Sequence, residues 1–165
     1  MGAEAATGRR KTIVVGYDGT APAENALRRA AEYARALAAR VVVVSVAPPL
    51  PLPEVGAAGA FGLLPYSTYP AGDAGRAAER DEQLWGQHRE RVQALFAEAD
   101  LHVDFVGVAG EPAEELVDAA EQHQAQLIIV GTREPGFLER LLGGSVSQDV
   151  ARQAHCDVLV VHPAG

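Results

Sequence analysis

The segment that decides the fold is Thr12–Ala34, TIVVGYDGTAPAENALRRAAEYA. Apolar residues dominate its first part, residues 12–17, which is typical of a strand buried on both faces of a parallel sheet. From residue 22 to residue 39, alanine and leucine recur at helical spacing, with arginine and glutamate on the opposite side. Pro22 suits the first turn of a helix, where its missing N–H leaves no bond unmade. The segment therefore predicts a strand, a short loop and a helix.

The same alternation repeats along the chain. Further apolar runs predict strands at residues 40–47, 102–108, 126–131 and 157–162. Further helical patterns lie at residues 77–99, 112–124 and 145–154. Strands that alternate with helices predict an α/β fold, a parallel sheet with helices on both faces. The run at 102–108 mixes polar with apolar residues more than the others, so we expect it toward an edge of the sheet.

The length of 165 residues suits one domain with one core. We expect residues 1–10 to form a disordered N-terminal tail and residues 11–165 to form a single domain. Within that domain, residues 48–75 are rich in proline, glycine and alanine, and they exceed the roughly 12–15 residues usual for a structureless loop. We expect a flexible loop there, either a disordered excursion or a lid that covers a ligand.

Charge and cysteine content argue against several classes of protein. The net charge of −8 argues against a general binder of nucleic acid or of anionic membranes, but it is compatible with a small anionic ligand held by backbone amides. No apolar run approaches the roughly 20 residues that span a bilayer. The single cysteine, Cys156, cannot form an internal disulfide, which favours a reducing compartment, so we expect a cytoplasmic protein. Cys156 itself is expected to be a small buried hydrophobe.

The loop after the first strand, Gly16–Ala23, is the first candidate site. Asp18 lies just past the carboxyl end of the strand, where a carboxylate can accept hydrogen bonds from the amine or hydroxyl group of a ligand. The alternative is that Asp18 and Thr20 only cap the first helix by accepting backbone N–H bonds. The residues alone favour the capping interpretation.

The loop Gly131–Ser145, GTREPGFLERLLGGS, is the second candidate site. Ser145 and Gln148 fit the S-x-x-Q capping box, which predicts that a helix starts at Ser145. The unpaired N–H groups and the partial positive charge of a helix start attract phosphate, and Gly143 and Gly144 would let a ligand approach the backbone closely. The alternative is a glycine-lined turn that only packs.

Several common catalytic motifs are absent from the sequence. Gly131 and Gly136 match the glycines of a P-loop, but Phe137 and Leu138 stand where lysine and serine or threonine are required. The only lysine, Lys11, precedes the first strand. No Gly-x-Ser-x-Gly elbow occurs, and the five histidines have no metal-ligand spacing. We therefore expect neither catalytic residues nor metal ligands.

Three segments together resemble the universal stress protein family, namely residues 12–34, 110–133 and 143–163. They look like the family's opening strand, loop and helix, its third helix with its fourth strand, and its closing helix and strand. The resemblance covers nearly the whole chain. It implies a five-stranded parallel sheet of the adenine nucleotide alpha hydrolase-like type, with strand order 3-2-1-4-5. It also implies a homodimer through strand 157–162, whose valine-rich edge would otherwise promote aggregation.

ATP-binding members of this family are similar in carrying Gly-x2-Gly-x9-Gly-(Ser/Thr) after the fourth strand. Gly131, Gly144 and Ser145 match this pattern, but Glu134 replaces the second glycine. Glu134 puts a side chain and a negative charge where the backbone should approach phosphate, and Arg133 can offset that charge. The resemblance implies ATP with Mg²⁺ as the ligand. The binding residues expected from it are Gly16, Tyr17, Asp18, Val46, Val130, Gly131, Arg133, Gly144, Ser145 and Val146.

These observations predict a cytoplasmic stress-response sensor or regulator that binds ATP as a homodimer and acts on protein partners. Two alternatives stay open. One is a dimeric stress protein of the same fold that binds no nucleotide and acts through protein partners alone. The other is a slow ATPase, or a relative that performs adenylate chemistry, although we can place no catalytic base. The effect of Glu134 on ATP binding separates the first two functions.

Overall fold

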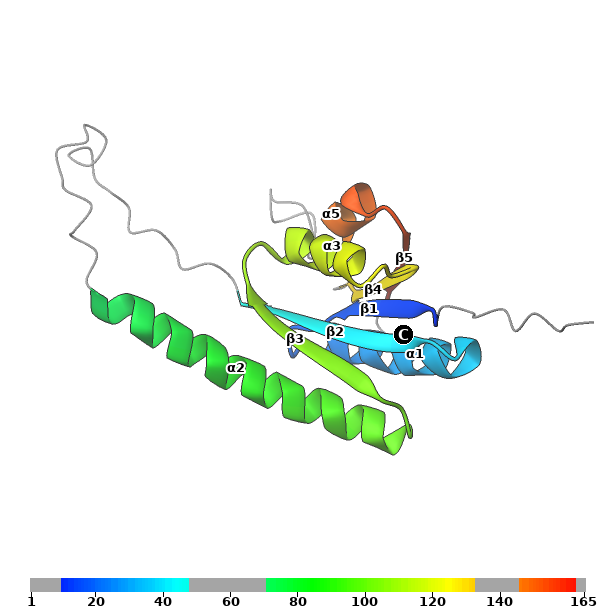
Figure 1. Cartoon of the computed structure of the whole chain (residues 1–165), viewed down its shortest axis with the longest axis horizontal. Coiled ribbons are helices and arrows are strands. Elements are labelled where there is room, and N and C mark those ends of the chain that lie inside the picture. Colours follow the sequence, from blue (N-terminus) through cyan, green and yellow to red (C-terminus); the bar gives the residue numbers. More distant parts are fainter. Residues whose placement is uncertain (1–9, 48–70, 133–145, 163–165) are drawn as a thin grey trace, which may run out of the picture.

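The computed structural model describes residues 10–47, 71–132 and 146–162. Strands and helices alternate along this part of the chain, as the sequence predicts (Figure 1). The strands are β1 (Thr12–Gly16), β2 (Arg40–Ala47), β3 (Val103–Ala109), β4 (Leu127–Gly131) and β5 (Asp157–Val161). The helices are α1 (Ala21–Leu37), α2 (Ala71–Glu98), α3 (Pro112–Gln122) and α5 (Val146–Gln153). The ends of these elements lie within two residues of the predicted ends, except for the start of α2.

All five strands lie in one parallel sheet, in the order β3-β2-β1-β4-β5 that the family resemblance implies. The central strand is β1, in which Val14 lies between Val42 of β2 and Ile128 of β4. The connection from β1 leads to β2 on one side, whereas the connection from β4 leads to β5 on the other side. The direction of winding therefore reverses between β1 and β4, and parallel sheets bind ligands at the carboxyl ends of the strands at such a reversal.

Helices cover both faces of the sheet, as predicted (Figure 1). Helices α1 and α2 pack on one face, against residues that include Ile13 and Val15 of β1. Helices α3 and α5 pack on the other face, against residues that include Val14 and Val42. These four side chains are at most 1% exposed, so burial on both faces explains the unbroken valine runs of the central strands.

Helix α2 begins at Ala71, although the sequence pattern predicts a start at residue 77. The apolar stripe of this helix begins only at Leu84, and residues 71–76 include two glycines, which are poor helix formers, so the local sequence does not indicate a helix there. The predicted loop 48–75 is therefore wrong at residues 71–75. The rest of that loop lies outside the described residues, as does nearly all of the predicted N-terminal tail.

The C-terminal half of α2 anchors this helix to the sheet. Val92 and Phe96 are completely buried in the core that α1 and α2 share with the sheet. Both residues belong to the predicted apolar stripe of this helix.

None of the helices that the structure describes combines the length and the apolar character that crossing a membrane requires.

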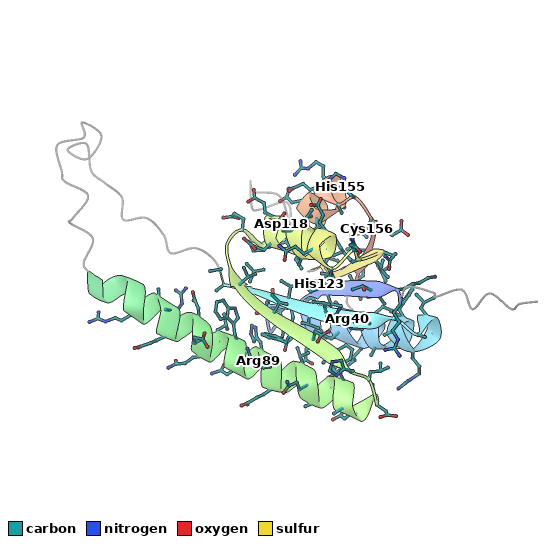
Figure 2. The ribbon with its side chains drawn as sticks, in the orientation of Figure 1. Arg40, Arg89, Asp118, His123, His155 and Cys156 are labelled. Atoms are coloured by element: carbon teal, nitrogen blue, oxygen red, sulfur yellow. The ribbon has the colours of Figure 1, made fainter. Side chains whose placement is uncertain are left out.

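Strand β3 lies at an edge of the sheet, as predicted, and α2 covers it. Trp85 of α2 lies over Gly107, where a Cβ atom would be 2.5 Å from the Trp85 Cδ2 atom. The guanidinium of Arg89, labelled on α2 in Figure 2, lies 5.3 Å from the centre of the Phe105 ring. These contacts place the middle of α2 against β3, in the half of the sheet that also contains β2.

Candidate functional site

The candidate site lies at the carboxyl ends of β1 and β4, and Gly131 brings its two halves together. Gly131 ends β4, and the first turn of α1 packs directly on it. A Cβ atom at this position would overlap the carbonyl of Pro22 and would lie 3.0 Å from the amide nitrogen of Ala23. Only glycine allows the two backbones to approach this closely. The loop after β1 and the loop after β4 therefore start side by side.

Short hydrogen bonds hold the loop between β1 and α1. Asp18 Oδ1 accepts from the Thr20 amide at 3.0 Å and from Thr20 Oγ1 at 2.6 Å. Thr20 Oγ1 in turn accepts from the Ala23 amide at 3.4 Å, so Thr20 is the N-cap of α1. Gly19 between them has φ of +79°, a conformation that glycine adopts without strain. The predicted capping is thus confirmed for Thr20, whereas Asp18 accepts its hydrogen bonds from Thr20 and orders the loop.

Capping leaves part of Asp18 available for a ligand. Asp18 is exposed, and only its Oδ1 atom takes part in the loop's hydrogen bonds. Within the part of the chain that the structure describes, no partner of Oδ2 is found. The loop therefore fixes the carboxylate by one oxygen, which leaves the second oxygen as a hydrogen-bond acceptor.

Tyr17 faces away from the candidate site. Its side chain is 5% exposed and belongs to the core on the α1 and α2 side, where its ring meets the ring of His88 edge-on at 5.0 Å. Burial, with a smaller contribution from the charge of Glu24, raises the pKa of the Tyr17 phenol. The Tyr17 amide donates to the Val44 carbonyl at 2.9 Å. Of Tyr17, therefore, the main chain lies at the carboxyl end of β1, and the side chain lies in the core.

Val46 and Val130 belong to the opposite face of the sheet, the one covered by α3 and α5. Val130 lies on β4 and Val46 on β2, where the register partner of Gly16 is Val44, two residues before Val46. A Cβ atom on Gly16 would lie 3.0 Å from Leu116 Cδ1 and 3.5 Å from Val130 Cγ1, so Leu116 of α3 fills the space above this glycine. Val130 is buried and Val46 is half-buried, which makes Val46 the more accessible of the two valines.

The phosphate side of the predicted site is described only in part. Arg133, Gly144 and Ser145 lie outside the described residues, and so does Glu134. Val146 is the first residue of α5 and is 41% exposed. The predicted start of this helix at Ser145 agrees to within one residue.

The structure also contains a polar pair, close to the loop after β1, that the sequence analysis does not predict. Ser45 Oγ of β2 and His88 Nδ1 of α2 lie 2.7 Å apart. Ser45 is completely buried, and burial lowers the pKa of His88 even though the charge of Asp18 acts in the opposite direction. Two sequence signals mark this pair. Ser45 interrupts a run of valines, and His88 stands on the apolar stripe of its helix, one turn from Leu84 and one from Val92.

Glu24 connects α1 to α2 beside Tyr17. Its Oε1 accepts from Arg91 Nε at 2.8 Å, and its Oε2 accepts from Arg91 Nη2 at 3.1 Å and from Arg28 Nη2 at 3.0 Å. Hydrogen bonding to Arg91 is the main reason why the pKa of Glu24 lies below its ordinary value. Because both arginines are exposed, these ion pairs orient the first turn of α1 more than they stabilise the fold.

Cys156 lies away from the candidate site, just before β5 and beneath α3 and α5 (Figure 2). It lines a cavity of about 110 Å³ together with Val117, Ala120 and Ile128. Burial raises the pKa of its thiol, so Cys156 acts as the small apolar side chain that the sequence predicts, although it is half-buried. The described ranges contain no group of three or more His, Cys, Asp or Glu side chains that could hold a metal ion.

The sequence is similar to one protein family over nearly its whole length. The matching family model is that of the universal stress protein family, and it covers residues 9–162. A universal stress protein of Thermus aquaticus is 33% identical over 153 residues, a match that covers 92% of this chain and 98% of that protein.

Two solved structures share the fold. The crystal structure of a universal stress protein in complex with cAMP has a TM-score of 0.64 and 24% identity, and the match covers 94% of this chain and 98% of that one. A universal stress protein from Archaeoglobus fulgidus in complex with dAMP has a TM-score of 0.53 and 23% identity, covering 91% and 96% of the two chains. The likeness to both concerns the fold.

Proposed function

This chain belongs to the universal stress protein family, and from that premise we propose that it binds an adenine nucleotide where the sheet reverses between β1 and β4. The proposed ligand is ATP with Mg²⁺. Two proteins of the same fold hold cAMP and dAMP, which supports an adenine nucleotide as the class of ligand. The reversal of a parallel sheet is also the usual place for a nucleotide in such folds.

The observation that carries the proposal is the geometry of Asp18. Its Oδ1 atom is held by two hydrogen bonds from Thr20, so the direction of the carboxylate is set before any ligand arrives. The remaining oxygen can accept a hydrogen bond from the exocyclic amine of adenine. Guanine presents a carbonyl oxygen at the corresponding ring position, and that oxygen would repel the carboxylate. The site therefore favours adenine over guanine.

The other proposed contacts fall on two sides of the nucleotide. Gly16, the main chain of Tyr17, Val46 and Val130 line the base and the ribose. Gly131, Arg133, Gly144, Ser145 and Val146 surround the phosphates. A helix start offers free N–H donors to such an anion, and α5 starts at Val146.

In the cell, we propose a cytoplasmic sensor or regulator whose nucleotide state is read by protein partners. The proposed active form is a homodimer that pairs through β5. No residue is assigned to catalysis, so the bound nucleotide acts as a signal and hydrolysis is at most slow.

The experiment is calorimetric titration of the purified chain with ATP and Mg²⁺, beside the variant Asp18→Asn. Asparagine keeps an acceptor oxygen for Thr20 but places an amide nitrogen toward the ligand. We expect ATP affinity to fall by about 10- to 100-fold, the equivalent of about 1.5–3 kcal/mol for a hydrogen bond to a charged group. The melting temperature without ligand should stay within a degree or so of the parent chain, because the loop bonds persist.

Two further measurements decide between the functions. Glu134→Gly should bind ATP more tightly than the parent, since it removes a carboxylate near the phosphates and allows close approach of the backbone. A parent chain that neither titrates nor gains thermal stability at millimolar ATP contradicts the proposal, because a ligand of the native state must stabilise it by mass action. That result would favour the dimer that acts through protein partners alone.

A further inference from the structure

His88 of α2 contacts three separate parts of the chain. Its Nδ1 atom lies 2.7 Å from Ser45 Oγ of β2, and its ring meets the Tyr17 ring edge-on at 5.0 Å. Its Nε2 atom lies against Gly19, only 2.8 Å from where a Cβ atom of that residue would be. One imidazole thus links the second strand, the end of the first strand and the loop that carries Asp18.

The Ser45 end of this contact is rigid. Ser45 is completely buried in a strand that pairs with β1 on one side and with β3 on the other. The hydrogen bond to such a fixed hydroxyl restricts rotation of the imidazole about its side-chain bonds. Consequently the Nε2 end of the ring is held at one position against the loop.

The Gly19 end is the part that needs support. Gly19 has φ of +79° and carries no side chain of its own to pack, so its conformation depends on its surroundings. The hydrogen bonds of Asp18 to Thr20 are local and exposed to water. Within the described residues, His88 is the side chain that closes the space beside Gly19.

We propose that His88 is a positioning residue for the nucleotide site. By supporting Gly19 from behind, it holds the loop in the conformation that directs Asp18 toward the adenine. The inference rests on the proposed function for its effect on affinity, but the support of the loop is a property of the protein without nucleotide. The charged groups near the ring are Asp18 on the loop, and beside Tyr17 the ion pair of Glu24 with Arg91.

The test distinguishes the contact of His88 Nδ1 with Ser45 from the contact of His88 Nε2 with Gly19. His88→Asn places an amide group where Nδ1 lies and keeps a bond to Ser45, but it is too short to reach Gly19. His88→Gln reaches the position of Nε2 and restores contact with the loop. His88→Ala removes both ends. Leu95→Ala is the matched control, because Leu95 packs the same helix against the same core at a distance from the loop.

The first readout is amide hydrogen exchange at Gly19, Thr20 and Ala23 in the nucleotide-free protein. We expect exchange to be at least about fivefold faster in His88→Ala and His88→Asn, and near the parent rate in His88→Gln and Leu95→Ala. The second readout is ATP affinity. It should fall about five- to tenfold in His88→Ala and His88→Asn and stay unchanged in His88→Gln and Leu95→Ala.

Each outcome tests a different part of the proposal. Unchanged exchange in His88→Ala and His88→Asn would overturn the positioning role, whatever the affinity does. Faster exchange with unchanged ATP affinity would overturn its consequence for binding. An equal loss of affinity in Leu95→Ala would show that His88 only stabilises the fold. If the parent chain binds no ATP, the proposed function fails while the exchange measurement still tests the support of the loop.

Discussion

Position 131 admits no side chain, because the backbone of α1 occupies the space where a Cβ atom would stand. Gly131→Ala must therefore push the first turn of α1 away from β4. We expect the free energy of unfolding to fall by about 1–3 kcal/mol, the usual cost of overpacking. Urea denaturation followed by circular dichroism measures this difference.

Gly86 supplies the control for that substitution. It lies within α2, and a Cβ atom there would meet nothing within 4 Å. Gly86→Ala should therefore stabilise the protein by about 0.5–1 kcal/mol, because alanine loses less conformational freedom in a helix. If the two alanine variants shift the urea midpoint in the same direction, the contact between Gly131 and Pro22 does not have the assigned role.

At the scale of single elements, the start of α1 depends on one hydroxyl. Thr20 Oγ1 accepts from the Ala23 amide and donates to Asp18, so it caps the helix and orders the loop together. Thr20→Ala should cost about 1 kcal/mol of stability, whereas Thr20→Ser should cost only a few tenths. Thermal unfolding of the three proteins gives the comparison. An alanine variant as stable as the serine variant would mean that the cap contributes nothing measurable.

The strands could be predicted from the sequence because burial on both faces leaves a local signature. The runs Val41–Val44 and Leu127–Val130 are apolar at every position, and both are strands of the central sheet. The start of α2 escaped prediction because residues 71–76, AGDAGR, carry no apolar stripe and include two glycines, which are poor helix formers. Periodicity is the main sequence signal of a helix, and it is missing there.

The candidate site could be predicted only in its local parts. The capping of α1 by Thr20 involves neighbours in sequence, and turn chemistry was sufficient to propose it. The pair formed by Ser45 and His88 joins residues 43 positions apart, so nothing in either local segment indicates its partner. The tight contact of Gly131 with Pro22 is equally long-range, and it appears only once α1 is packed on the sheet.

At the scale of the whole molecule, β3 and β5 are the two edge strands of the sheet, each with one strand neighbour within the described chain. Helix α2 packs on β3, and α1 and α5 pack on β5. The outer side of an edge strand is a template for pairing with a second chain. The proposed homodimer uses the β5 edge, as the family resemblance implies.

Matched lysine substitutions at the two edges test that interface. Val158 of β5 and Val108 of β3 are both half-buried and pack toward the α3 and α5 face of the sheet. Val158→Lys should weaken self-association by at least about tenfold, because lysine at an edge opposes strand pairing. Val108→Lys should leave self-association unchanged at a similar cost in stability. Sedimentation equilibrium measures both, and a monomeric parent chain or equal effects of the two variants would contradict the assignment.

The contact between Gly131 and Pro22 changes how the glycine signature of this family should be interpreted. The first glycine of that signature is required here by the packing of a helix on a strand. A chain with the same helix contact would need glycine at this position whether or not it binds a nucleotide. The positions that bear on nucleotide binding itself are therefore the later ones in the signature.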